Sequence, residues 1–115
     1  MRLSEIIEVL GLEPLTPAIE PRGEVTGGHA SELLSDVLAN APRGGVLVTV
    51  QAHMNVVAVS VHADLGAVIF AAGRRPEAAV VRKAAAEGLP LYATGEPAFD
   101  VVGRLYELGL RGGRS

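Results

Sequence analysis

The stretch Thr26-Gly27-Gly28, followed by Ser31-Glu32-Leu33-Leu34-Ser35-Asp36-Val37, predicts a sharp turn from a β-strand into a helix. Glycine permits tight backbone conformations, and the apolar spacing of the run after it is typical of a helix. Backbone N–H groups at such a turn can approach an anion at a helix end that is already partly positive. The stretch therefore favours an α/β module that binds a ligand; the alternative is a tight turn that needs glycine for backbone reasons alone.

Outward from this stretch, short apolar runs alternate with helical patterns. The runs predict strands over residues 24–26, 46–50, 67–72 and 89–94, and helices over residues 4–10, 31–40, 53–63, 76–87 and 97–108. Residues 13–22 contain three prolines and are expected to form an extended connector. Such alternation implies parallel strands and right-handed crossovers. We expect a three-layer α/β fold with a mostly parallel sheet of four to five strands and helices on both faces.

The length of 115 residues predicts a single domain over residues 1–115. Within it, residues 1–22 form an N-terminal helix and a proline-rich connector, and residues 111–115 form a flexible tail. No signal-peptide core and no run of about 18 apolar residues is found, so a cytoplasmic protein without a membrane span is expected.

Composition excludes several classes of site and partner. The absence of cysteine excludes disulfides, thiolate zinc sites and thiolate-ligated iron–sulfur clusters. A net charge of −3 and an aromatic content of 3% argue against nucleic-acid binding. A mean hydropathy of +0.33 is high for a small monomer and predicts a homodimer or another protein partner, unless it reflects only a core rich in alanine and valine.

Polar residues and glycines gather where the expected strands end. Ligands of open α/β sheets bind beyond the carboxyl ends of the strands, so we expect these residues to converge on one crevice. The alternative is a set of ordinary polar turns. The candidate ligand-binding residues are Thr26, Gly27, Gly28, Gln51, His53, Asn55, Gly73, Arg74, Arg75 and Thr94.

Arg74 and Arg75 directly precede a predicted helix, where cations oppose the helix dipole. This placement indicates compensation by an anion such as a phosphate or a partner's carboxylate, unless Glu77 supplies enough balance. His53 and Asn55 follow the central strand and could present hydrogen bonds to a ligand, or serve only as a helix start.

No catalytic motif accompanies these residues. The patterns GxxxxGK[ST], GxGxxG and GxSxG do not occur, and no two histidines have the i,i+4 spacing of a metal site. We therefore expect no enzyme activity, no metal and no cofactor.

The chain resembles the DRTGG domain family at Thr26-Gly27-Gly28, at Leu34-Ser35-Asp36-Val37-Leu38 and at Thr49-Val50-Gln51-Ala52-His53-Met54-Asn55-Val56-Val57-Ala58-Val59. The similarity continues through Gly73, the alanine-rich helix from Pro76, Leu91-Tyr92-Ala93-Thr94 and residues 99–106, and so covers residues 20–110. The Asp-Arg pair that names the family is replaced by Glu24-Val25.

The resemblance implies a fold like the amino-terminal domain of HPr kinase/phosphorylase and a regulatory role. Related domains accompany nucleotide-sensing CBS domains, and stand-alone versions resemble accessories of hydrogenase-type redox systems. We therefore expect a non-enzymatic regulatory module that binds a small anionic ligand, for example a nucleotide, and acts through a homodimer. The alternative is a ligand-free accessory subunit of a hydrogenase-type redox or kinase assembly; a third hypothesis is a small enzyme that uses His53.

Overall fold

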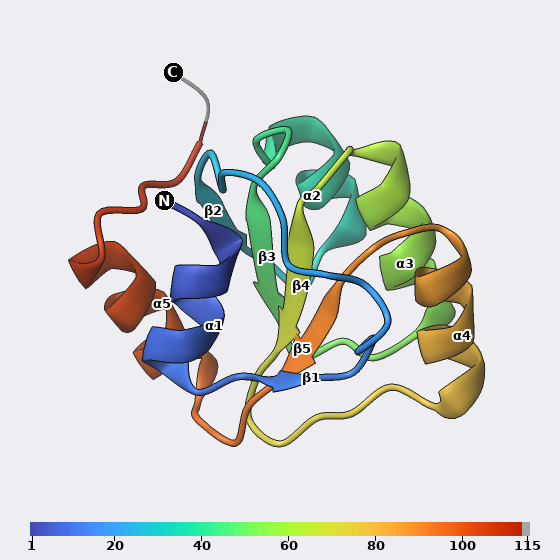
Figure 1. The fold of residues 1–115 in the computed structure, drawn as a ribbon. Helices are drawn as coiled ribbons and strands as arrows, with labels where there is room; N and C mark the ends of the chain where they lie inside the picture. The colour runs from blue at the N-terminus through green and yellow to red at the C-terminus, as the bar shows by residue number, and fades with distance from the viewer. Residues whose placement is uncertain (114–115) are drawn as a thin grey trace.

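A five-stranded sheet forms the centre of the molecule in the computed structural model, which describes residues 1–113 (Figure 1). The strand order across the sheet is β1-β5-β4-β3-β2. The strands are β1 (Glu13–Pro14), β2 (Gly28–Ala30), β3 (Val46–Thr49), β4 (Ala67–Phe70) and β5 (Leu91–Ala93). Strands β2 to β5 are parallel, and β1 joins the edge of β5 in the antiparallel direction.

The helices cover both faces of this sheet (Figure 1). They are α1 (Leu3–Leu10), α2 (Leu34–Asn40), α3 (Met54–His62), α4 (Ala78–Ala86) and α5 (Ala98–Glu107). One apolar cluster joins α1 and α5 to alternate residues of the strands, including Val48 and Ile69. A second cluster joins α2, α3 and α4 to the residues in between, including Leu47, Val68 and Phe70.

The two central strands explain why the layers form. Every residue of β3 and β4 is buried, because each strand is covered by helices on both faces. Continuous runs of valine, leucine and isoleucine, rather than alternating polar and apolar residues, suit such strands. The three-layer, mostly parallel architecture expected from the sequence is therefore confirmed.

Three local expectations differ from the structure. The strand predicted over residues 24–26 is wrong, since β2 begins at Gly28 and Glu24 makes only an isolated bridge to Arg2. Residues 13–22 are not entirely a connector, because β1 lies within them. At the other end, Gly112 forms a parallel bridge to Gly28, so the expected free tail starts no earlier than residue 113. The rest of that tail, residues 114–115, lies outside the described residues.

Among the helices of residues 1–113, none combines the length and the hydropathy needed to cross a lipid bilayer.

The fully buried Phe70 provides a test of the sandwiched core. We expect Phe70→Ala to lower the free energy of unfolding by about 3–5 kcal/mol, because it removes a large ring from close packing and leaves a cavity. Urea denaturation measures the change. The matched control is Leu33→Ala at a site that is 65% exposed, where a change within about 0.5 kcal/mol is expected. Equal effects of the two substitutions would contradict this packing.

Candidate functional site

Seven of the ten predicted site residues lie at the carboxyl edge of the sheet. Gln51, His53 and Asn55 follow β3, the three residues 73–75 follow β4, and Thr94 follows β5. The strands are adjacent and parallel, so their carboxyl ends meet at one edge. The structure thus brings these seven residues to the same side of the sheet.

Backbone hydrogen bonds tie the loop after β4 to the loop after β5. The Ala72 N–H donates to the Glu96 carbonyl oxygen at 2.7 Å, and the Gly73 N–H donates to the Thr94 carbonyl oxygen at 3.0 Å. Ala72 and Gly73 both have left-handed backbone conformations, with φ of 56° and 72°. A non-glycine residue in this region is uncommon, and here the hydrogen bonds to the neighbouring loop hold it in place.

The two arginines of this edge differ in their surroundings. Arg75 donates two hydrogen bonds to the Glu13 carboxylate, at 2.8 and 2.7 Å, because antiparallel β1 places Glu13 opposite Ala93. The hydrogen bond from Arg75 lowers the pKa of Glu13. Arg74 is exposed, and the described part of the chain records no hydrogen bond or ion pair of its side chain. The expected compensation is thus internal for Arg75, whereas no partner of the Arg74 side chain is recorded in residues 1–113.

Glu32 is a polar residue of this edge that the sequence did not single out. Its carboxylate accepts hydrogen bonds from the Val50 N–H at 2.9 Å and from the Thr49 hydroxyl at 2.7 Å. The Gln51 side-chain amide donates to the Glu32 carbonyl oxygen. An internal carboxylate therefore occupies the donors at the end of β3, and Gln51 is held by the chain itself. The sequence did carry a signal for this contact. Glu32 is an acidic residue two positions after β2, and Thr49 places a hydroxyl group at the end of the neighbouring strand β3.

The start of α3 has no internal anion. His53 is the N-cap residue, its side chain makes no capping hydrogen bond, and the first turn contains no acidic residue. Both His53 and Asn55 are exposed at this helix start. Unpaired N–H groups at a helix start carry partial positive charge and favour a negative ligand. This end of α3 and Arg74 follow adjacent strands, so both present positive character at the same edge.

Thr26, Gly27 and Gly28 do not join this group. Gly28 begins β2 and pairs with Val46, the first residue of β3, so the three residues lie at the amino edge of the sheet. The expectation that all the candidate residues converge on one crevice is wrong for this stretch. Its cause is the misplaced strand, since Thr26 and Gly27 precede β2 and Gly28 begins it, whereas the sequence predicted that all three follow a strand.

Close backbone packing explains the glycine at position 27. A Cβ atom there would lie 2.8 Å from the Arg111 carbonyl oxygen and 3.3 Å from Cγ of Pro42. The Gly28 N–H donates to that same Arg111 oxygen at 3.0 Å, and the Thr26 hydroxyl donates to the Arg43 carbonyl oxygen at 2.6 Å. These residues anchor the chain after α5 and the loop before β3, which supports the structural reading of the Gly-Gly pair.

A matched pair of glycine substitutions tests this reading. Gly27→Ala is expected to lower the free energy of unfolding by about 1–3 kcal/mol, because the new methyl group overlaps the Arg111 carbonyl oxygen. Gly28→Ala is expected to be nearly neutral, since its Cβ would lie 3.8 Å from the nearest atoms. Thermal and urea denaturation of both variants measure the difference. A neutral Gly27→Ala, or a larger loss at Gly28, would contradict the packing.

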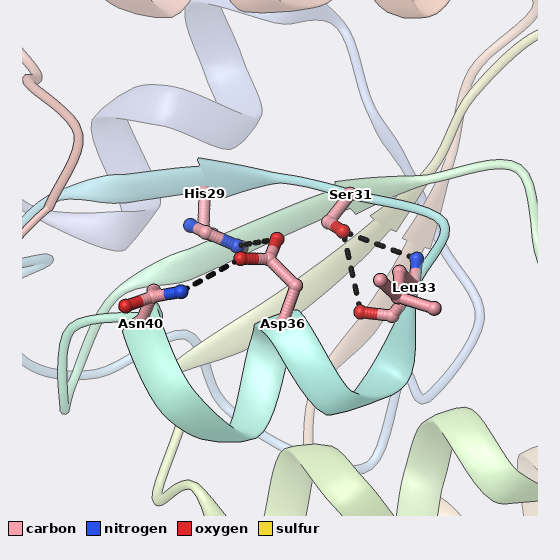
Figure 2. A network of polar contacts seen from close by, with 5 residues as sticks. All are labelled: His29, Ser31, Leu33, Asp36 and Asn40. Carbon is pink, nitrogen blue, oxygen red and sulfur yellow. Dashed lines mark hydrogen bonds and ion pairs between the residues drawn. The ribbon is translucent and has the colours of Figure 1, made fainter.

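A polar network centred on Asp36 joins β2 to α2 (Figure 2). The Asp36 carboxylate lies 2.8 Å from His29 Nε2 and accepts a hydrogen bond of 2.8 Å from the Asn40 amide. Hydrogen bonding by Asn40, followed by that of Ser31 and His29, lowers the pKa of Asp36 to about 2. Ser31 and Leu33 exchange hydrogen bonds in the turn before α2, so the network fixes the entry to this helix.

The lowered pKa of Asp36 predicts a pH-dependent contribution to stability. The ionised carboxylate stabilises the folded state above its unfolded pKa of about 4, and the contribution is lost as pH falls towards 2. Asp36→Asn should therefore be less stable than the natural chain at pH 7, and the difference should shrink between pH 4 and pH 2. Urea midpoints measured across this range provide the test. A difference that stays constant with pH would show that the charge of Asp36 is not responsible.

Two cavities lie away from the carboxyl edge. One, of about 180 Å³, lies between β2 and α5 and is lined by Ala30, Val102 and Tyr106 among others. Another lies beside the amino edge, between the end of α2 and the end of α3. Within residues 1–113, no three histidine, aspartate or glutamate side chains are grouped so that they could hold a metal ion.

Comparison with known proteins identifies a related fold. No protein-family model matches the chain, and no curated protein matches it. A solved structure with a similar fold is the regulatory region of Clostridium perfringens pyrophosphatase, with its CBS and DRTGG domains, in complex with the activator diadenosine tetraphosphate. The TM-score is 0.71 at 14% sequence identity, and the match covers 89% of this chain and 44% of that chain. This likeness shows a shared α/β fold.

Proposed function

We propose that this chain is a non-enzymatic regulatory module with a DRTGG-like fold that binds a small anionic ligand at the carboxyl edge of its sheet. The observation that carries the proposal is that the exposed Arg74 and the uncapped start of α3 follow two adjacent parallel strands, β4 and β3, at one edge of the sheet. A guanidinium and free backbone N–H groups are the donors that phosphate groups prefer. Arg74, His53 and Asn55 contact the ligand, and Gly73 and Thr94 shape the loops around it.

The remaining residues of the edge hold the site in position. The Glu13–Arg75 pair fixes the loop that carries Arg74, and Glu32 fixes Gln51 and the end of β3. Thr26, Gly27 and Gly28 are excluded from the site because they lie at the opposite edge of the sheet. The structural neighbour is a regulatory region in complex with a dinucleoside polyphosphate, which supports a nucleotide as the anion.

Arg74→Ala tests the site directly. Isothermal titration calorimetry with diadenosine tetraphosphate and with ATP measures the affinity. We expect Arg74→Ala to weaken binding by about 1–3 kcal/mol, roughly 5- to 150-fold, because a charge-assisted hydrogen bond is lost. The matched control is Arg82→Ala, which removes the same charge from the exposed side of α4 and should leave the affinity within twofold.

Two results would overturn the proposed site. The first is an equal loss of affinity in the Arg74 and Arg82 variants, which would indicate only a general charge effect. The second is the absence of stabilisation in a thermal-shift screen of nucleotides and phosphorylated metabolites. A ligand at 100 times its Kd stabilises the folded state by about 2.7 kcal/mol, which is readily detected.

A second candidate function is that of an accessory subunit without a ligand, in a redox or kinase assembly. The observation that favours it is the apolar surface of α5, where Phe99 is 88% exposed. Phe99 forms a contiguous exposed apolar patch with Val102 and Tyr106, and such patches are typical of protein interfaces. This candidate replaces the first if no anion binds.

A further inference from the structure

The outer surface of α5 carries a stripe of exposed apolar side chains. Phe99, Val102 and Tyr106 are 88%, 38% and 57% exposed, and their spacing of three and four residues places them on one side of the helix. Ala30 of β2 lies beside them, since these four residues line one shallow depression. We call this surface the α5 face. It combines a protruding ring, Phe99, with the edge of the sheet.

The cavity of about 180 Å³ adjoins this same face. It lies between α5 and β2, and it shares Ala30, Val102 and Tyr106 with the α5 face. Leu105 and Leu110 make the rest of its lining mainly apolar. An apolar cavity of about 150 Å³ accommodates benzene, so this cavity is large enough for a phenyl ring. The α5 face therefore carries both a projecting ring and a recess that fits one.

The edge of β2 is partly open. The Val46 N–H donates to the Gly27 oxygen and the Ser31 N–H donates to the Val48 oxygen, so residues 27, 29 and 31 turn their polar backbone groups towards β3. Gly28 and Ala30 turn theirs outward. Residues after α5 pair with Gly28 but leave Ala30 at the open edge. An open strand edge is a template for pairing with another chain.

Charged residues of both signs border this face. Glu107 lines the depression, and the Arg111 guanidinium lies 3.5 Å from the centroid of the Tyr106 ring. Arg111 donates to the carbonyl oxygens of Tyr106 and Leu110, and neither it nor Glu107 has a recorded ion pair in residues 1–113. In a two-fold interface, residue i of one copy meets residue j of the other and the reverse. A face with both an acidic and a basic residue is complementary to itself in such an arrangement.

We propose that a second copy of this chain docks on the α5 face about a two-fold axis, with Phe99 of each copy inserted into the cavity between β2 and α5 of the other. Full burial of aromatic side chains of this size implies that Phe99 and Tyr106 together supply roughly 200–350 Å² per copy. That is a substantial part of the roughly 800 Å² per partner in a standard interface. Val102 and the β2 edge extend the contact.

The inference goes beyond the proposed function and does not depend on the anion site. It is tested without any anion, so failure of the dimer leaves the ligand site standing, and failure of ligand binding leaves the dimer standing.

Sedimentation equilibrium of the whole chain, from 1 to 200 μM, tests the proposal. The natural chain should be dimeric at the upper end of this range. Phe99→Asp should be monomeric, with at least a 100-fold weaker association, and an acidic residue in the first turn of α5 does not oppose the helix dipole. Ala30→Phe should also be monomeric, because its ring fills the cavity from the same chain. Leu33→Asp is the control at an exposed apolar site, the N-cap of α2, and should remain dimeric.

Fluorine NMR identifies the face without a substitution. The chain contains two phenylalanines, Phe70 in the core and Phe99 on the surface, so labelling with fluorophenylalanine gives two signals. The Phe99 signal should move with protein concentration, and the Phe70 signal should not. A natural chain that stays monomeric at 200 μM overturns the proposal. A dimer whose Phe99 signal does not change, or one that persists in Phe99→Asp, also overturns it.

Discussion

The burial of β3 and β4 from both sides is the constraint on which the rest of the structure depends. These two strands pair along their whole length, from Val46 opposite Ala67 to Thr49 opposite Phe70. Their side chains alternate between the cluster beneath α1 and α5 and the cluster beneath α2, α3 and α4. Thr49 is the polar residue of these two strands, and their other side chains are apolar. The polar residues that could contact a ligand therefore lie beyond the ends of the strands.

This arrangement explains what the sequence could predict. The runs Val46-Leu47-Val48 and Val68-Ile69-Phe70 are readable as buried parallel strands, and they determine which residues follow at the carboxyl edge. Seven candidate residues were placed at one edge by this reasoning. The error arose at β2, which contains only glycine, histidine and alanine, so that the more apolar Glu24-Val25-Thr26 resembled a strand better. β2 is held by backbone pairing with β3 rather than by burial of its own side chains, so its sequence lacks the apolar pattern that predicts a strand.

The contacts of Glu32, Glu13 and Arg75 were beyond sequence analysis for a different reason. Each joins residues far apart along the chain, 62 positions in the case of Glu13 and Arg75, and depends on which strands are neighbours. The strand order cannot be derived from hydrophobic periodicity. Once it is known, the described residues of this edge separate into groups that the chain already neutralises, such as Arg75, and groups with no recorded partner, such as the Arg74 side chain and the uncapped start of α3.

The glycines of the amino edge have a consequence for the divergence of such a chain. Gly27, Gly45 and Gly66 let backbone segments touch where a methyl group would meet an atom at 3.0 Å or less. This end of the molecule is therefore fixed by the absence of side chains and tolerates little substitution. At the far end of the strands, a Cβ atom at Gly73 or Gly95 would meet nothing within 4 Å, so close backbone packing does not limit the side chains there. In a protein of this design, the fold is preserved while the side chains that would contact a ligand change.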